Sequence, residues 1–192
     1  MPHRLLFIDT ETGGLDPDRH SLLSFAMVIW EDMKIIDSKE VLINDGILSV
    51  NKEALSINKI DIEKHKQSAM TSSQAMDEII SFIGKHFPGH GKITLAGHNV
   101  HFDADFLKRF FSANNKDFSE FFSHRIIDTS SILHYLYLAG RIKHRAISSD
   151  EAFDLFDIKV EGRHTALGDA IATAKLFTKL LDLLKQGIIR GT

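Results

Sequence analysis

Two acidic residues that follow an apolar run near the N-terminus are the first feature of the sequence able to do chemistry. Asp9 and Glu11 come directly after LLFI and are separated only by Thr10. Because alternate side chains of an extended strand project from the same face, both carboxylates are expected to point the same way. Two like charges in one place are costly unless a cation lies between them. A solvated strand end would show the same short pattern, so the pair acquires meaning only with other groups.

A third carboxylate, Asp103, lies in the segment GHNVHFDADFL (97–107), where an apolar strand is predicted to pass into a helix. Sheets of α/β proteins place their binding sites at such strand ends. An acidic residue at a helix start also pairs commonly with the helix dipole, which is the alternative explanation. We expect Asn99 to reach the backbone near this helix start and to hold the carboxylate in place.

The segment HTALGDA (164–170) contributes His164 and Asp169. On an ideal helix a spacing of five residues separates two side chains by about 140°, so the two would not share a helix face. If His164 instead precedes the helix and Asp169 lies in its first turns, both can approach one site. A histidine on such a segment suits a general base that acts on water. A surface histidine beside a capping aspartate is the alternative.

Four carboxylates and one histidine, each at the end of an element, together fit the requirements of a two-metal site. Two Mg²⁺ ions ~3.5–4 Å apart need several hard oxygen ligands, and they clamp the attacking and leaving oxygens of a phosphoryl displacement. The combination therefore predicts phosphoryl-transfer chemistry.

The same residues carry a resemblance to a known family. The segments FIDTETGGLDP (7–17), 97–107 and 164–170 resemble, in the same order, the three motifs of the DEDDh 3′–5′ exonucleases, which include the proofreading subunit of bacterial replicative polymerase and ribonuclease T. The resemblance implies a ribonuclease H-like fold and release of nucleoside 5′-monophosphates from 3′ ends. It also implies two Mg²⁺ ions, for which Mn²⁺ can substitute, and a catalytic set in which four residues are metal ligands and His164 is the general base: Asp9, Glu11, Asp103, Asp169 and His164.

Further positions are candidates for contact with the substrate: Thr10, Glu53, Asn58, Asn99, Phe102 and His164. The segment NKEALSINKI (51–60) resembles the family segment in which a glutamate and a histidine lie near the terminal nucleotide. Glu53 fits that pattern, whereas Asn58 occupies the usual histidine position and can still hydrogen-bond sugar or phosphate. Phe102 lies beside Asp103 and is a candidate for stacking on a base. Ser24 stands where an acid is often found, a change we expect to be tolerated.

The elements that must position these residues are predicted from apolar periodicity and from Gly and Pro breaks. We expect one exonuclease domain over residues 1–192, of class α/β, with a mixed sheet flanked by helices. An antiparallel meander of three strands is expected at 5–9, 21–30 and 34–44, and further strands at 93–99 and 125–128. Helices are expected at 51–57, 71–87, 102–113, 129–140, 148–156 and 164–187. The rest of 45–70 is expected to be irregular. Ser72 or Ser73 is the expected N-cap of helix 71–87, a capping box is expected from Ser148 to Glu151, and Gly187 is the expected end of the last helix.

Composition excludes several classes of protein. The chain has 192 residues, of which 43% are hydrophobic and 26% charged, with a formal net charge of -3 and no cysteine. Disulfides and cysteine-ligated zinc are therefore excluded, and no apolar stretch approaches the ~18 residues of a membrane helix. His98 and His101 form an H-x-x-H pair for which no partner pair with zinc spacing exists. We expect a cytoplasmic protein.

The expected partners are nucleic-acid 3′ ends and a polymerase or other replication and repair proteins, with the chain a monomer or homodimer and no membrane involved. DNA is the expected substrate, because the first and third motifs look closer to the proofreading type. The alternatives are a 3′–5′ exoribonuclease and an inactive nucleic-acid-binding module on the same fold.

Overall fold

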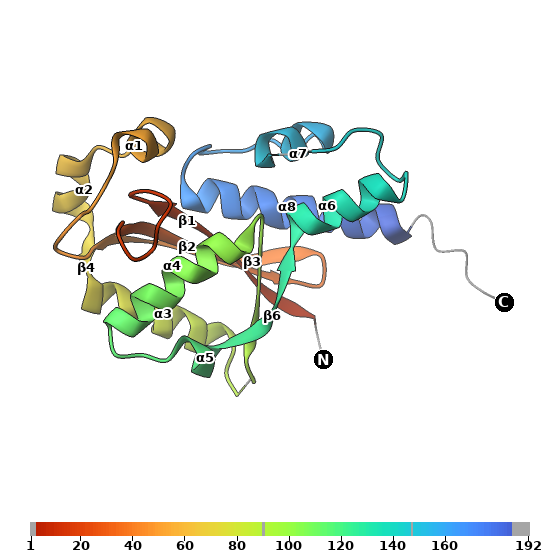
Figure 1. Cartoon of the computed structure of the whole chain (residues 1–192). Coiled ribbons are helices and arrows are strands. Elements are labelled where there is room, and N and C mark those ends of the chain that lie inside the picture. Colours follow the sequence, from red (N-terminus) through yellow and green to blue (C-terminus); the bar gives the residue numbers. More distant parts are fainter. Residues whose placement is uncertain (1–2, 90, 147, 186–192) are drawn as a thin grey trace.

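A mixed sheet of six strands forms the centre of the computed structural model, which describes residues 3–89, 91–146 and 148–185 (Figure 1). The strand order is β4-β3-β2-β1-β5-β6. Strands β1 to β3 form an antiparallel meander, whereas β5 runs parallel to β1 and β6 parallel to β5. The expected α/β class and mixed sheet are confirmed. The strands are β1 Arg4–Thr12, β2 Leu22–Glu31, β3 Lys34–Asn44, β4 Met70–Thr71, β5 Ile93–Gly97 and β6 Phe122–Asp128.

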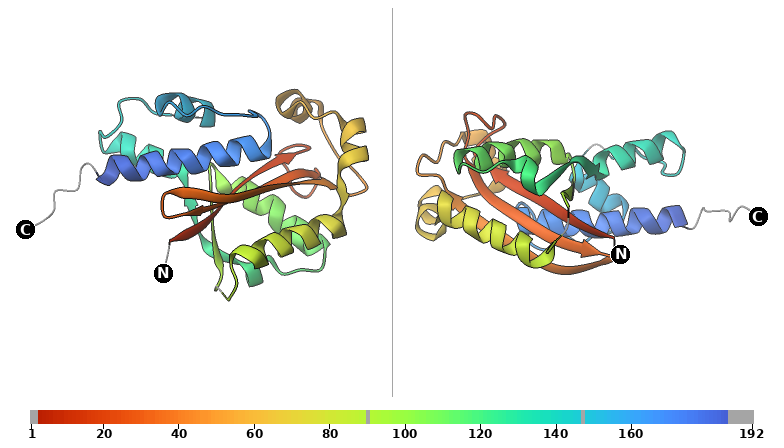
Figure 2. Two further views of the ribbon diagram at one scale, coloured as in Figure 1. Left: turned by 180° about the vertical axis from the view of Figure 1, so that it is seen from behind. Right: turned by 90° about the horizontal axis from the view of Figure 1, so that it is seen from below.

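Helices cover both faces of this sheet (Figure 2). Helices α3 and α4 pack on one face, and α8 packs on the other with α6 and α7 outside it. Within the described ranges, no helix is long and apolar enough to cross a membrane. The helices are α1 Lys52–Asn58, α2 Ile62–Ser68, α3 Ser72–His86, α4 Val100–Ala113, α5 Phe118–Phe121, α6 Thr129–Leu138, α7 Ser149–Leu155 and α8 Ala166–Lys185.

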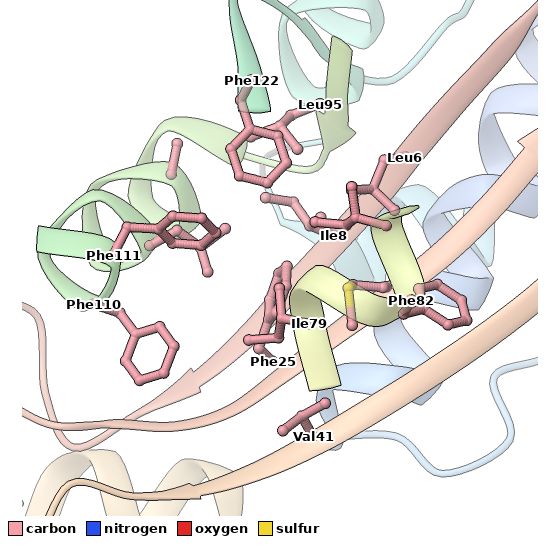
Figure 3. Packing of buried hydrophobic residues seen from close by; sticks show 14 of the residues in the cluster. Leu6, Ile8, Phe25, Val41, Ile79, Phe82, Leu95, Phe110, Phe111 and Phe122 are labelled. Carbon is pink, nitrogen blue, oxygen red and sulfur yellow. The ribbon is translucent and has the colours of Figure 1, made fainter. Parts of the chain in front are cut away.

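The alternation of side chains along β1 decides which helix each of its residues meets. Leu6 and Ile8 enter the core beneath α3 and α4 (Figure 3), whereas Phe7 packs against α8 on the opposite face. Because side chains alternate with a period of two, Asp9 and Glu11 share the α8 face with Phe7. Thr10 shares the α4 face.

Helix α8 approaches the sheet through small side chains. Ala166, Ala170 and Ala174 recur every four residues, form one stripe and are fully buried against the sheet. The ring of Phe177 then lies 5.4 Å from that of Phe7, which fixes the helix along β1. This close packing brings the first turn of α8 beside the end of β1.

Several elements differ from the sequence expectation. The segment expected to be irregular contains α2 and β4, and α5 precedes β6. Strand β1 continues past Asp9, because its backbone pairs with β2 as far as Thr12 even though its apolar run has ended. Glu11 is therefore still paired with β2, opposite Ser24, directly before a shift in the strand register.

The helix boundaries also require corrections. The N-cap of α3 is Thr71 rather than Ser72 or Ser73, because Thr71 forms a capping box with Gln74. Ser148 caps α7 as predicted, and its hydroxyl accepts from the backbone N–H of Glu151 at 3.2 Å. Helix α8 begins at Ala166, so the two preceding residues of the expected helix lie outside it. Gly187 lies outside the described residues.

Candidate active site

Three carboxylates meet where the end of β1 faces the first turn of α8. Asp9 and Glu11 come from alternate positions of β1, and Asp169 lies in the first turn of α8. Each offers a carboxylate oxygen, and these oxygens all lie within 4.8 Å of one another. The prediction that Asp9 and Glu11 project together is therefore confirmed, and α8 supplies the third acid.

Asp103 approaches this group of acids from α4, on the other face of the sheet. It is buried in the first turn of α4, where the Thr10 hydroxyl donates to its Oδ1 at 2.6 Å. Together with Asp9 and Asp169, Asp103 lines a cavity of about 570 Å³. Thr10 thus ties the acid of α4 to the strand that carries Asp9 and Glu11.

Burial is the main cause that raises the pKa values of these acids, and the charges of neighbouring acids add to it. Burial, followed by the charge of Asp169, raises the pKa of Glu11 to about 8. Burial also raises the pKa of Asp103 to about 7, against the hydrogen bond from Thr10. The pKa of Asp9 is raised well above its ordinary value by burial and then by the charges of Asp103 and Asp169. Four mutually repelling acids therefore favour either protons or cations among them.

The donor set fits a hard divalent cation. Oδ1 of Asp169 is buried and has no hydrogen-bond partner among the residues that the structure describes. A buried carboxylate oxygen without a donor is costly. Divalent cations such as Mg²⁺ bind carboxylate oxygens, and an ion there would satisfy this atom and neutralise Asp9 and Glu11.

His164 lies in the turn before α8. This is the placement that the sequence requires if His164 and Asp169 are to approach one site. The φ of His164 is 63°, in the left-handed region, and its side chain is half-buried. The pKa of Asp169 is raised by burial, and the charges of Arg163 and then His164 oppose that rise. His164 is therefore close enough to interact with the acidic cluster, but it is not among the described residues that line the 570 Å³ cavity.

A second cavity, of about 360 Å³, adjoins the first. Thr10, Leu15 and Phe102 line both cavities. Glu53, in the first turn of α1, lines the second one, as do Glu11 and Asn58. Leu15 is 82% exposed, so an apolar residue is presented to solvent where the two cavities meet.

The expected role of Asn99 is wrong. Asn99 is the N-cap residue of α4 with a φ of 57°, and its side chain makes no capping hydrogen bond within the described residues. Its backbone N–H instead donates to Asp128 at 2.8 Å. Thr10 takes the role expected of Asn99, because it hydrogen-bonds the Asp103 carboxylate directly. Asn99 still lines the cavity.

The side chain of Asn58 hydrogen-bonds to the protein backbone. Its Nδ2 donates to the carbonyl oxygen of Thr12 at 3.2 Å, and its Oδ1 accepts from the N–H of Ile60 at 3.1 Å. These contacts tie the end of α1 to the end of β1. Asn58 therefore builds the cavity wall, a role that its position in the family pattern did not indicate.

Sequence reasoning missed two side chains of the site. His98, dismissed as a zinc ligand, lines the cavity, and its Nδ1 lies 3.0 Å from the Thr129 hydroxyl. Arg163 donates to Asp169 and lies 2.6 Å from Asp150. In the sequence, the position of Arg163 directly before His164 was an indication that Arg163 belongs to the site. It was a weak indication, because a single arginine in a loop has many ordinary explanations.

Comparison with known proteins identifies the family that this chain matches. Residues 6–177 match the model of a family described as exonuclease. The chain is 27% identical to ribonuclease T of Wigglesworthia glossinidia brevipalpis, with 93% of this chain and 85% of that protein aligned. It is 30% identical to the oligoribonuclease of Bordetella pertussis, over 68% of this chain and 73% of that protein.

The fold itself is shared with a solved nuclease. Exonuclease I of E. coli, in complex with a dT13 oligonucleotide, superimposes with a TM-score of 0.81 at 17% sequence identity. The alignment covers 95% of this chain and 42% of that chain, so this chain spans less than half of Exonuclease I. Since the family match covers most of the sequence and the three motifs meet at one cavity, the chain belongs to the DEDDh family of 3′–5′ exonucleases.

Proposed function

We propose that this protein is a Mg²⁺-dependent exonuclease that removes nucleoside 5′-monophosphates from the 3′ ends of single-stranded or frayed DNA. The observation that carries the proposal is the convergence of four acids: oxygens of Asp9, Glu11 and Asp169 lie within 4.8 Å of one another, and Asp103 lines one cavity with Asp9 and Asp169. Mn²⁺ is expected to replace Mg²⁺, because both accept hard oxygen ligands.

The four carboxylates would hold the divalent ions. When bound, such ions supply an activated water and stabilise negative charge on the phosphate under attack. Asp9 and Glu11 offer ligand atoms from β1, and Asp169 offers from α8 its buried Oδ1, which has no hydrogen-bond partner within the described part of the chain. Thr10 keeps the Asp103 carboxylate aimed by donating to it.

His164 would take the proton from the attacking water. It precedes α8 on a turn that also carries Arg163, and it interacts with Asp169. Because His164 is not part of the cavity lining, the turn must bring its ring over the substrate phosphate for this role. A general base of this kind contributes typically ~10²–10⁴-fold to the rate.

The adjoining cavity would receive the terminal nucleotide. Leu15 and Phe102 present apolar surface where the two cavities meet, which suits contact with the faces of bases. Glu53 offers a carboxylate acceptor for sugar hydroxyls from the first turn of α1. An unpaired end fits this arrangement, since a base must leave the stack to meet these side chains.

RNA is the second candidate substrate. The relatives named above at 27% and 30% identity are a ribonuclease T and an oligoribonuclease, which favours RNA, whereas the structural neighbour holds a DNA oligonucleotide. A protein distinguishes the two at the 2′-OH of the bound sugar. The sugar pocket near Glu53 would make that distinction.

Parallel digestion tests the proposal. Single-stranded DNA and RNA of the same sequence, each labelled at the 5′ end, are incubated with Mg²⁺ and resolved by length over time. Stepwise shortening from the 3′ end, faster on DNA, is the expected result, and Asp103→Asn should show none. Faster shortening of RNA would transfer the proposal to an exoribonuclease, and no shortening of either strand would overturn it.

A further inference from the structure

Arg163 links helix α7 to the acidic cluster. Its Nε lies 2.6 Å from Oδ1 of Asp150, and its Nη2 donates to the Ser149 hydroxyl at 3.1 Å. Its guanidinium lies over the ring of Phe153, 5.6 Å from the ring centre. On the other side its Nη1 donates to Oδ2 of Asp169. One planar group therefore bridges two helices.

Because of this bridge, the two carboxylate oxygens of Asp169 have different surroundings. Oδ2 is held by Arg163, while the buried Oδ1 has no hydrogen-bond partner among the described residues. A carboxylate rotates as a rigid plane, so fixing one oxygen fixes the direction of the other. We infer that Arg163 is a positioning residue that aims Asp169 at the divalent cation of the site, an inference that rests on the proposed function.

A competing role follows from charge alone. The positive charge of Arg163 beside Asp169 repels a divalent ion. In this alternative role, the guanidinium neutralises Asp169 in place of the metal, and the metal must displace it to bind. The surroundings of Arg163 favour the positioning role, because Asp150 pairs with the guanidinium and offsets its charge. Ser149 and Phe153 hold the same group from the side of α7. Hydrogen-bonding partners of metal ligands commonly act in this way.

The two roles predict opposite changes in metal affinity. If Arg163 repels the metal, its removal strengthens metal binding. If Arg163 aims Asp169, R163Q weakens binding by about 10–100-fold, the usual effect of removing such a partner. D150N should weaken binding to a smaller extent, since it removes one anchor of the guanidinium. The double variant should bind no more weakly than R163Q, because Asp150 acts through Arg163.

Calorimetric titration with Mn²⁺ alone, without nucleic acid, measures these affinities, and circular dichroism checks that each variant is folded. R109Q is the matched control: it also removes one positive charge, but from an exposed arginine paired with the exposed Asp18. It should leave the Mn²⁺ affinity unchanged. If R163Q does not fold, D150N decides, because Asp150 is 63% exposed and its loss leaves the core intact.

Equal or tighter Mn²⁺ binding by R163Q, or by D150N where R163Q does not fold, would overturn the inference while leaving the proposed function standing. Additive losses in the double variant would also overturn it, because the two residues would then act separately. If the wild-type protein binds no Mn²⁺, the proposed metal centre fails and the role of Arg163 fails with it.

Discussion

At the scale of single residues, the raised pKa values of the cluster make the metal-free protein sensitive to pH. Burial and the charge of Asp169 raise the pKa of Glu11 to about 8, so the folded state favours the protonated side chain. A group with a raised pKa contributes stability that is complete below its unfolded pKa of ~4.3 and is lost as the pH rises through its folded value. Without metal, the melting temperature should therefore decrease as the pH rises from about 4.5 to about 8.

Glu11→Gln should remove part of that dependence. At pH 8.5 in chelator the variant is expected to melt above the wild type by a few degrees, since 1 kcal/mol shifts Tm by roughly 2–4 °C in a chain of this size. At pH 5 the difference should shrink. Calorimetric melts at the two pH values measure it, and Glu120→Gln, at an exposed acid of α5, is the control. A wild-type Tm that rises from pH 5 to 8.5 in chelator would contradict the account.

Substitution of His164 and of Asp169 by alanine should affect turnover and metal binding differently. His164→Ala is expected to lose about 10²–10⁴-fold in turnover, the usual contribution of a general base, while it still binds Mn²⁺. Asp169→Ala should weaken Mn²⁺ binding itself, because it removes a ligand. Rates on a single-stranded oligonucleotide and calorimetric titration with Mn²⁺ separate the two effects. Equal loss of Mn²⁺ binding by both variants would show that the assigned role of His164 is wrong.

The site could be predicted where spacing or motif order carries geometry. Asp9 and Glu11 were placed together by the period of a strand, and Asp169 by its motif. The partner of Asp103 could not be predicted, because Thr10 and Asp103 are 93 residues apart and meet only across the sheet. Arg163 was missed for a similar reason: its meaning depends on contacts with α7 that no local pattern shows.

At the scale of elements, Gly168 lets the first turn of α8 lie against the turn that carries Arg163 and His164. A Cβ at Gly168 would lie 2.2 Å from the carbonyl oxygen of Gly162 and 2.5 Å from that of Glu161. Since both contacts are with backbone, Gly168→Ala must push the turn away from the helix. Overpacking of this kind costs about 1–3 kcal/mol.

Gly168→Ala is therefore expected to lower Tm and to reduce turnover strongly, because it displaces His164 from Asp169. Gly84→Ala in α3 is the control: it is also a helical glycine, but a Cβ there meets nothing within 4 Å. That variant should be stabilised by up to about 1 kcal/mol, the difference in helix propensity. Thermal melts and oligonucleotide turnover of both variants provide the comparison, and equal behaviour would refute the role of Gly168.

Local patterns predicted the long elements and some short ones, such as α1 and α7, but missed α2, β4 and α5. The continuous apolar run of β2 and the helical apolar patterns of α3 and α4 extend over enough residues to identify each element. Helix α2 has a single buried residue, His65, so it carries little apolar periodicity. Strand β4 has only two residues and exists because β3 offers an edge to pair with. Elements of this kind are defined by tertiary contacts rather than by their own sequence.

At the scale of the whole molecule, divalent cations should stabilise the fold. The acids of the cluster come from β1, α4 and α8, so neutralising them relieves repulsion between both layers of helices and the sheet. A ligand present at 100 times its Kd adds about 2.7 kcal/mol, or roughly 5–10 °C in Tm for this chain length. Melts with Mn²⁺ and with chelator test this at pH 7.5. Asp9→Asn should lose most of the shift, and an unchanged wild-type Tm would count against a metal centre in this cluster.

The central claim is that these carboxylates hold the metal of a 3′–5′ exonuclease, and one digestion tests it most directly. A single-stranded DNA oligonucleotide labelled on its 3′-terminal nucleotide is incubated with the wild-type protein in Mg²⁺, in excess chelator, and with Asp9→Asn in Mg²⁺. The account predicts immediate release of the label as a 5′-mononucleotide in the first reaction and none in the other two. Release at the full rate in chelator or by Asp9→Asn, or loss of the 5′-terminal nucleotide before the 3′ label, would contradict it.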